Sequence, residues 1–138
     1  MFIDPYKDTA FTVLTLTLWG ECRGESYDGK VAVASVIWNR AKDYMLKHDT
    51  LDMKTALKMV CLLPKQFSCW RDKNEFLQEK PYDCPQWSDC VHIVTSMMIE
   101  KFLPVFNCRY YHATSIRPPM WTKELKIVKQ IGNHIFYS

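Results

Sequence analysis

Residues 29–45 read GKVAVASVIWNRAKDYM, and this stretch predicts the central helix of the fold. Apolar side chains recur along it at the spacing that places them on one helical face: Val31, Ala34, Trp38, Ala41 and Met45. Further apolar residues widen that face: Val33, Val36 and Ile37. Asp28 can cap the first turn, so we expect a helix over residues 28–46.

The stretch before this helix is ambiguous between helix and strand. Residues 8–25 mix an apolar period of two with a period of three to four, and their threonines favour a strand. The stretch is longer than most strands and meets no turn signal before Gly20. We therefore predict a helix, with Asp8 as its N-cap.

Two more helices are predicted downstream. Residues 49–63, DTLDMKTALKMVCLL, have an amphipathic pattern that Pro64 stops. Pro85 suits the first turn of a helix that continues through residues 86–103 until Pro104 ends it. The residues between these two helices look mostly irregular.

The tail predicts a small sheet. In LKIVKQIGNHIFYS, β-branched and aromatic residues lie on either side of Gly132-Asn133, which suits a two-residue hairpin turn. The expected fold class is therefore α+β, predominantly α-helical, with a small C-terminal β-hairpin. No internal repeat or Gly/Ser linker is visible in the 138 residues, so we expect a single domain over residues 1–138.

Charge and hydropathy argue against several classes of partner. The formal net charge is +3, and lysine and arginine are spread along the chain, so no nucleic-acid partner is expected. No apolar run approaches the ~20 residues of a membrane span, and we expect no stable membrane insertion. The apolar run of residues 10–19 lacks the basic leader and the cleavage site of a signal peptide, which indicates folding in a cytoplasm.

The six cysteines lack the tight spacing of a disulfide framework, and we expect free thiols. Cys84, Cys90 and His92 lie close together in the sequence, but without a C-x-x-C pair they are a weak zinc candidate. His112 with His134 is a weak metal or acid–base candidate, because no acidic residue lies at a ligand-like spacing. We therefore expect no metal and no cofactor.

Residues 18–26 read LWGECRGES and place two carboxylates directly after an apolar run. If this stretch is helical, Glu21 and Glu25 are i,i+4 neighbours on one face, while Arg23 points roughly the opposite way. A neighbouring like charge and an apolar setting both raise the pKa of a carboxyl group, as a general acid near neutral pH requires. Spacing alone favours the simpler alternative, two solvated glutamates at a helix end.

Glycosidic cleavage by two carboxylates needs them on opposite sides of the bond, about 5 Å apart or up to ~9.5 Å apart. Two acids on one helical face would lie on the same side of a bound polymer. A one-acid mechanism fits better, in which Glu21 or Glu25 protonates the leaving oxygen and the substrate supplies its own nucleophile. Weaker candidates for a second carboxylate are Asp28, Asp43, Asp72, Asp83 and Asp89.

Two other segments suit a carbohydrate groove. In KQFSCW, Gln66 and Ser68 flank Phe67, so that an amide and a hydroxyl could contact sugar acetamides beside a stacking ring. The segment RYYHATSIRPPMW combines two tyrosines with His112 and Trp121. Taken singly, each of these aromatic residues is more often part of a core than of a binding surface.

Together these segments resemble the SleB/CwlJ-like family of bacterial cell-wall hydrolases. WGECRGESYDGKVAVASVIWNR (19–40) is similar to the family signature G-E-x-R-G-E…G…VA-x-V-x-x-NR. QFS (66–68), YYHATSIRPPMW (110–121) and IGNHIFY (131–137) follow in the family's order and extend the match over nearly the whole chain. The resemblance implies a lysozyme-like fold of the branch related to lytic transglycosylases, and an enzyme that degrades peptidoglycan.

The resemblance also implies residue roles. The first glutamate of the signature, here Glu21, is the catalytic acid. In related transglycosylases it protonates the oxygen between N-acetylmuramic acid and N-acetylglucosamine, and then acts as a base while the muramic 6-hydroxyl closes an anhydro ring. Arg23 and Glu25 would be supporting, and Tyr111 would help to position Glu21 or the sugar. The residues expected to bind substrate are Gln66, Phe67, Ser68, Tyr111, His112 and Trp121.

The chain departs from the family at Cys22, where alanine or serine is common, and in the charged, cysteine-rich residues 71–90. A compact chain without an export signal looks like a bacteriophage endolysin. We expect it to act as a monomer, made in the host cytoplasm and released to the wall through a holin-type lesion. The alternatives are a hydrolytic, lysozyme-type muramidase, a non-catalytic glycan-binding module, and a thiol or zinc protein.

Overall fold

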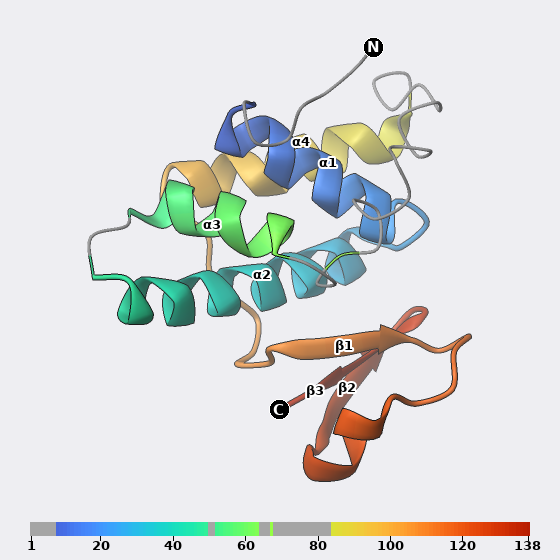
Figure 1. The fold of residues 1–138 in the computed structure, drawn as a ribbon. Helices are drawn as coiled ribbons and strands as arrows, with labels where there is room; N and C mark the ends of the chain where they lie inside the picture. The colour runs from blue at the N-terminus through green and yellow to red at the C-terminus, as the bar shows by residue number, and fades with distance from the viewer. Residues whose placement is uncertain (1–7, 50–51, 64–66, 68–83) are drawn as a thin grey trace.

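Helices occupy the first part of the described chain, and a small sheet occupies its end (Figure 1). The computed structural model describes residues 8–49, 52–63, 67 and 84–138. The helices within these ranges are α1 (Ala10–Cys22), α2 (Tyr27–Lys47), α3 (Met53–Leu62) and α4 (Pro85–Met98). The strands are β1 (Tyr110–Ala113), β2 (Ile127–Ile131) and β3 (His134–Tyr137), and the 3₁₀ helix η4 (Met120–Glu124) precedes β2. The predicted class, mostly helical with a small C-terminal sheet, is confirmed.

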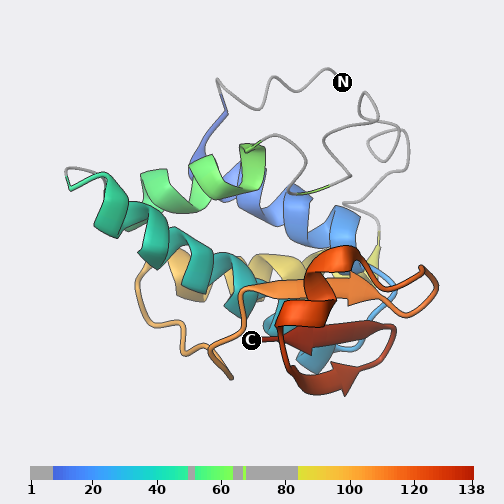
Figure 2. The same ribbon diagram turned by 60° about the horizontal axis from the view of Figure 1, so that its bottom comes forward.

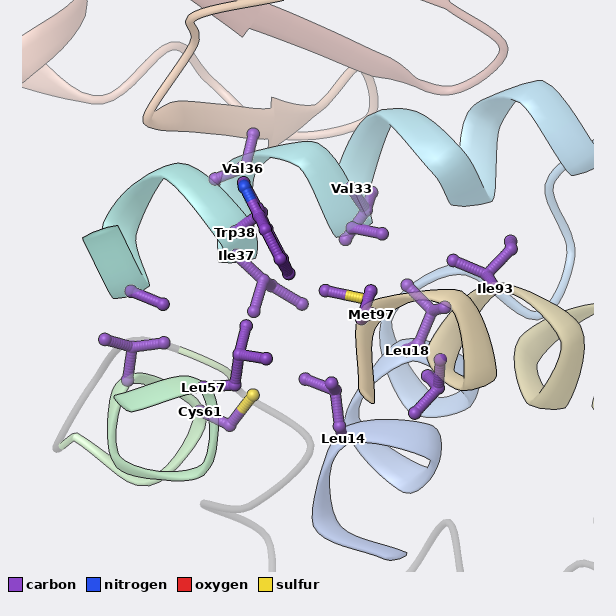
Figure 3. Close-up of a cluster of buried hydrophobic side chains, with 14 of the residues drawn as sticks. Leu14, Leu18, Val33, Val36, Ile37, Trp38, Leu57, Cys61, Ile93 and Met97 are labelled. Atoms are coloured by element: carbon purple, nitrogen blue, oxygen red, sulfur yellow. The ribbon is translucent and has the colours of Figure 1, made fainter. Parts of the chain in front are cut away.

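The central position predicted for α2 is confirmed. This helix lies between the other described helices on one side and the sheet on the other (Figure 1, Figure 2). The Ser26 hydroxyl caps it by accepting the Gly29 N–H at 3.1 Å, whereas Asp28, the predicted cap, lies in its first turn. Its core residues are fully buried (Figure 3): Val33, Val36, Ile37 and Ala41. Burial of each of the valine and isoleucine side chains contributes about 1.5–3 kcal/mol to folding.

α1 is shorter than predicted at both ends. Thr9 caps it in place of Asp8, because the Thr9 hydroxyl accepts the Thr12 N–H at 3.2 Å. The helix ends at Cys22, and the Glu25 N–H donates to the Cys22 carbonyl at 2.9 Å in the turn that leads to α2. Glu25 therefore lies outside the helix.

Burial on nearly every side explains the ambiguous sequence pattern of α1. Its buried residues run almost without a break from Val13 to Trp19. Thr15 and Thr17 are fully buried, and each hydroxyl donates to the carbonyl four residues earlier at 2.7 Å. Because these threonines bond to their own helix, they fit a helix as well as a strand.

α3 and α4 have the predicted type but different ends. Asp52 caps α3 by accepting a first-turn N–H at 2.7 Å, so the helix begins well inside the predicted segment. α4 begins at Pro85 and ends at Met98, before Pro104, because Glu100 adopts a left-handed φ of 56°. None of the described helices combines the length and the apolar character of a membrane span.

The predicted hairpin is confirmed, and a third strand joins it. β2 and β3 are antiparallel and meet at Gly132, whose φ is 55°. β1 pairs antiparallel with β3, which gives the strand order β1-β3-β2. The sequence did not predict β1, because YYHA shows no apolar–polar alternation and its partner strand lies far along the chain.

The two faces of the sheet have different surroundings. On the face toward the helices, the Tyr111 ring lies 5.0 Å from His134 and 5.6 Å from Phe136, and Phe136 belongs to the core. On the other face, neighbouring rings lie 5.2–6.0 Å apart. This outer aromatic cluster consists of Tyr110, His112, Trp121 and Tyr137.

Candidate active site

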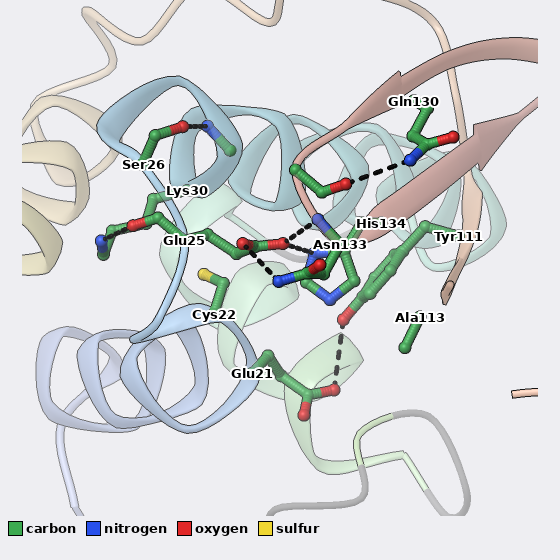
Figure 4. Close-up of polar contacts among 12 residues, drawn as sticks. Glu21, Cys22, Glu25, Ser26, Lys30, Tyr111, Ala113, Gln130, Asn133 and His134 are labelled. Carbon is green, nitrogen blue, oxygen red and sulfur yellow. Dashed lines mark hydrogen bonds and ion pairs between the residues drawn. The ribbon is translucent and has the colours of Figure 1, made fainter. Parts of the chain in front are cut away.

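Glu21 lies in the last turn of α1, where this helix meets the sheet (Figure 4). Its side chain is half-buried, and its Oε1 accepts a hydrogen bond from the Tyr111 hydroxyl at 3.2 Å. The two residues are 90 positions apart in the sequence, so the fold alone creates this contact. It joins the helical part of the molecule to β1.

The Tyr111 phenol is held as a hydrogen-bond donor. Burial raises its pKa well above the usual value of 10, and the negative charge of Glu21 raises it further. The nearby Arg40 charge acts in the opposite direction. Tyr111 therefore keeps its proton and presents it to the Glu21 carboxylate.

Glu25 contacts the turn between β2 and β3 (Figure 4). Its Oε1 accepts the backbone N–H of Asn133 at 2.7 Å and lies 3.4 Å from Nδ1 of His134. A Cβ at Gly132 would come within 2.9 Å of Glu25 Oε2, and the positive φ there also favours glycine. The hairpin turn and the Glu25 carboxylate thus fit closely against each other.

The prediction that Glu21 and Glu25 share one helical face is wrong. α1 ends before Glu25, whose side chain is 8% exposed and turned toward the hairpin. The two carboxylates therefore have different partners, Tyr111 for Glu21 and the hairpin turn for Glu25. Repulsion between the Glu21 and Glu25 carboxylates on one helical face is therefore not the feature that defines this site.

His134 is a buried imidazole beside Glu25. Burial lowers its pKa below the usual 6.5, the Glu25 charge opposes this shift, and His112 acts in the same direction as burial. The ring also packs edge-on against Tyr111, with centroids 5.0 Å apart. A neutral His134 therefore links the Glu25 contact to the Tyr111 contact.

Arg23 stacks on its own helix. Its guanidinium carbon lies 4.5 Å from the centre of the Trp19 ring, and its backbone N–H donates to the Trp19 carbonyl at 3.0 Å. Through these contacts Arg23 caps the C-terminal end of α1, shortly after Glu21.

Two residues that the sequence reasoning gave no role tie α2 to β1. The buried Asn39 amide donates to the carbonyls of Phe106 at 2.9 Å and Cys108 at 3.0 Å. Nε of Arg40 donates to the Arg109 carbonyl at 2.7 Å. Both belong to the N-R pair of the family signature, which was the available signal. They fix the approach to β1 and so the position of Tyr111.

His112 and Trp121 are not brought together with Glu21. His112 is 5% exposed in the outer aromatic cluster, with Nδ1 2.8 Å from the Ala113 carbonyl and Nε2 2.7 Å from the Tyr137 hydroxyl. Since a carbonyl only accepts, Nδ1 donates and Nε2 accepts in the neutral ring. Trp121 packs edge-on against Tyr137 at 5.2 Å. His112 and His134 lie on opposite faces of the sheet.

Of the predicted QFS contacts, only Phe67 can be placed. It is 3% exposed and belongs to the core, and the Arg40 guanidinium carbon lies 5.5 Å from its ring centre. Gln66 and Ser68 lie outside the described residues, so their predicted contacts with sugar stay predictions.

The other candidate carboxylates are engaged elsewhere or lie outside the described residues. Asp43 pairs with Arg109, Asp89 lies 3.7 Å from Lys30, and Asp28 is exposed in the first turn of α2. Asp72 and Asp83 are not among the described residues.

The described cysteines are free thiols, and Cys69 lies outside the described residues. Burial raises the pKa of Cys61 and of Cys90 to about 12, so neither thiol is a ready nucleophile. In the described part of the chain, no group of three His, Cys, Asp or Glu side chains is placed to hold a metal ion. His92 is exposed and packs against Tyr27, whereas Cys90 is fully buried.

The chain matches the model of a known protein family. A family described as Cell Wall Hydrolase matches residues 24–137. This range includes Glu25, Arg40 and Tyr111, and it begins three residues after Glu21.

Related proteins and structures agree with this match. The spore cortex-lytic enzyme of Oceanobacillus iheyensis is 28% identical over an alignment of 137 residues. The alignment covers 95% of this chain and 42% of that protein. The Bacillus subtilis enzyme of the same name is 24% identical, over 95% of this chain and 38% of that protein. The chain thus spans less than half the length of these relatives.

Two solved structures share the fold. The catalytic domain of Bacillus cereus SleB is 26% identical, with a TM-score of 0.64 over 94% of this chain and 89% of that domain. The catalytic domain of SleB from Bacillus anthracis, a germination-specific lytic transglycosylase, is 24% identical, with a TM-score of 0.65 over 99% of this chain and all of that domain. The second likeness, at this identity, concerns the fold alone.

Proposed function

The chain belongs to the cell wall hydrolase family, and on this premise we propose that it cleaves peptidoglycan glycan strands at the β-1,4 bond between N-acetylmuramic acid and N-acetylglucosamine. The B. cereus structure that it resembles is a catalytic domain, and nearly the whole chain aligns with it. The two longer relatives, from Oceanobacillus iheyensis and Bacillus subtilis, are spore cortex-lytic enzymes. This supports a glycan-cleaving role for the part that they share with this chain.

One observation supports a single catalytic acid: Glu21 is held by Tyr111, while Glu25 is engaged by the hairpin turn. Enzymes that use two carboxylates place them on opposite sides of the scissile bond. Glu25 is bonded to Asn133 and nearly buried, so it is poorly placed for that role. Glu21 then serves as acid and base in turn.

The proposed reaction needs no water. The Glu21 carboxyl donates its proton to the glycosidic oxygen, the bond from that oxygen to C1 of the muramyl residue breaks, and N-acetylglucosamine leaves with the proton. The 6-hydroxyl oxygen of the muramyl residue bonds to the same C1, and its proton passes to the Glu21 carboxylate. The acid is thereby restored, and the product carries a 1,6-anhydro ring. Tyr111 keeps the carboxylate in place between the two steps.

The Glu21→Gln variant tests the acid. The amide cannot donate a carboxyl proton, so release of fragments from purified cell walls is expected to fall at least ~100-fold. Asp28→Asn is the matched control, because it removes an exposed carboxylate at the start of α2. Thermal unfolding of both variants checks the fold. A folded Glu21→Gln protein that lyses walls at the wild-type rate would overturn the assignment.

The same walls separate the proposal from its alternatives. A hydrolytic muramidase would add water and leave reducing muramic ends. A non-catalytic glycan-binding module would sediment with insoluble peptidoglycan and release no fragments.

The biological setting is proposed from the sequence as host-cell lysis by a phage endolysin that acts as a monomer. Its relatives act on the spore cortex, so the choice of substrate distinguishes the two settings. An endolysin is expected to degrade vegetative walls faster than purified cortex. The reverse order would contradict that role, and size-exclusion chromatography with light scattering tests the monomer.

A further inference from the structure

A polar pocket lies where α2, the end of α3 and β1 meet. It encloses about 250 Å³. Its polar and aromatic lining consists of Arg40, Asp43, Tyr44, Lys47, Arg109 and Tyr110. The volume is below the ~300–1,000 Å³ of typical small-molecule sites, so the pocket suits a group of amino-acid size and not a whole sugar chain.

The pocket carries an excess of positive charge. Arg109 and Asp43 form a two-point ion pair, with Nε to Oδ2 at 2.5 Å and Nη2 to Oδ1 at 3.1 Å. This pair is neutral as a unit, and Arg40 and Lys47 add two further cations. The pocket is therefore suited to an anionic group.

Arg40 makes the inner wall of this pocket rigid. Its Nε donates to the Arg109 carbonyl at 2.7 Å, and its guanidinium carbon lies 5.5 Å from the Phe67 ring and 5.9 Å from the Tyr110 ring. Burial lowers the pKa of Arg40, because a buried guanidinium loses part of its hydration. An anion in the pocket would compensate for part of that loss.

The pocket lies near the candidate active site. Arg40 lines it, beside Tyr110 of β1. The Glu21 charge acts on Arg40, so these two groups are close in space. A glycan chain bound at Glu21 could therefore place a side branch in this pocket.

We propose that the pocket binds a carboxylate of the peptide stem attached to a muramyl residue, and that the enzyme thereby prefers glycan strands that carry stems. The inference rests on the proposed function. Where each muramyl lactyl group is amide-linked to a stem, the sugars of the strand are neutral, so stem carboxylates are the anionic groups that such a strand brings to the site. Guanidinium and ammonium groups bind carboxylates through charge-assisted hydrogen bonds.

Direct binding tests the proposal without relying on catalysis. A soluble N-acetylmuramyl tripeptide has no glycosidic bond to cleave, so the wild-type protein can be titrated with it in a calorimeter. Lys47→Glu is expected to weaken its binding about fivefold, because an exposed attraction becomes a repulsion. Asp43→Asn is expected to tighten binding, because it removes the one carboxylate of the lining. Lys42→Glu, the same charge change at an exposed α2 position outside this lining, should leave binding unchanged.

Kinetics give the second readout. Strands with stems are compared with strands that an amidase has stripped of stems and whose freed lactyl carboxyl groups have been converted to amides, both free of phosphate polymers. We expect Lys47→Glu to lower the ratio of kcat/KM on stem-bearing to stripped strands about fivefold, and Lys42→Glu to preserve it. Equal binding of N-acetylmuramyl tripeptide and the primary amide of N-acetylmuramic acid, which has no carboxylate, or an equal loss in both charge variants, would overturn the proposal. If instead Glu21→Gln stays active while the pocket variants behave as expected, the assigned acid is wrong and the pocket stands.

Discussion

Tyr111 is the residue whose hydroxyl holds the Glu21 carboxylate in place at the end of α1. Its single hydrogen bond to Glu21 joins α1 to β1 at 3.2 Å. A hydrogen bond to a charged group is worth about 1.5–3 kcal/mol, so Tyr111→Phe is expected to lower kcat about 10-fold or more. The assay is product release from soluble glycan fragments, with Tyr27→Phe, an exposed tyrosine on α2, as the control. An unchanged kcat would show that this hydroxyl has no part in the reaction.

Glu25 is a positioning residue in this account, and its variants should behave unlike those of Glu21. Glu25→Ala removes the acceptor of the Asn133 N–H and is expected to lower the free energy of unfolding by about 1–2 kcal/mol. Glu25→Gln keeps an acceptor oxygen and should recover most of the stability and most of the activity. Urea unfolding and wall lysis measure the two effects. If Glu25→Gln were as inactive as Glu21→Gln, both carboxylates would be needed and the one-acid mechanism would fail.

At the residue scale, the sequence singles out Glu21 as the candidate acid but does not predict its surroundings. Glu21 stands in a specific motif that resembles a known family, and its catalytic role stays a prediction. The partner of Glu25 was not readable, because Asn133 lies 108 positions away and the contact depends on where the hairpin docks. For the same reason Asp43 and Arg109, 66 positions apart, gave no sign of their pairing.

At the scale of elements, the hairpin of β2 and β3 is sensitive to pH through His134. Burial lowers the pKa of this histidine below 6.5, so on acidification the unfolded chain takes up a proton at higher pH than the folded protein does. Stability is therefore expected to fall as the pH drops from about 6.5 toward the folded value, and to be unaffected by this group above that range. Glu25, His112 and Tyr111 are titratable groups near the ring; Glu25 moderates the effect, and Tyr111 stays protonated in this pH range because its pKa is raised.

His134→Gln tests this dependence. Urea unfolding at about pH 7.5 and about pH 5 is expected to show a smaller loss of stability on acidification in the variant than in the wild-type protein. The difference between the two losses is the readout, because other groups titrate in both proteins alike. Equal losses would show that His134 takes up its proton equally in both states.

The elements themselves were predictable where local signals were strong. α2 followed from its apolar periodicity and the hairpin from Gly132-Asn133, because both signals lie within a few adjacent residues. The end of α1 was predicted too far along the chain, because the turn after Cys22 depends on a local backbone hydrogen bond. β1 could not be predicted, since its four residues, YYHA, show no apolar–polar alternation and its partner strand lies far along the chain.

At the scale of the whole molecule, α2 is the scaffold that places the helices and the sheet relative to each other. It lies between them, and its Asn39 and Arg40 hold the segment that leads into β1 (Figure 1). Glu21 comes from the helical side and Tyr111 from the sheet side. The proposed stem pocket lies along the same junction, so one interface between helices and sheet would carry both cleavage and substrate choice.

The central claim is that Glu21 alone, as acid and then base, cleaves the strand without water. Mass spectrometry of the fragments released from purified peptidoglycan tests it most directly. The account predicts muropeptides that end in 1,6-anhydromuramic acid, each lighter by one water molecule than the hydrolysis product, and none from the Glu21→Gln variant. Fragments with reducing muramic ends, or anhydro fragments released equally by that variant, would contradict it.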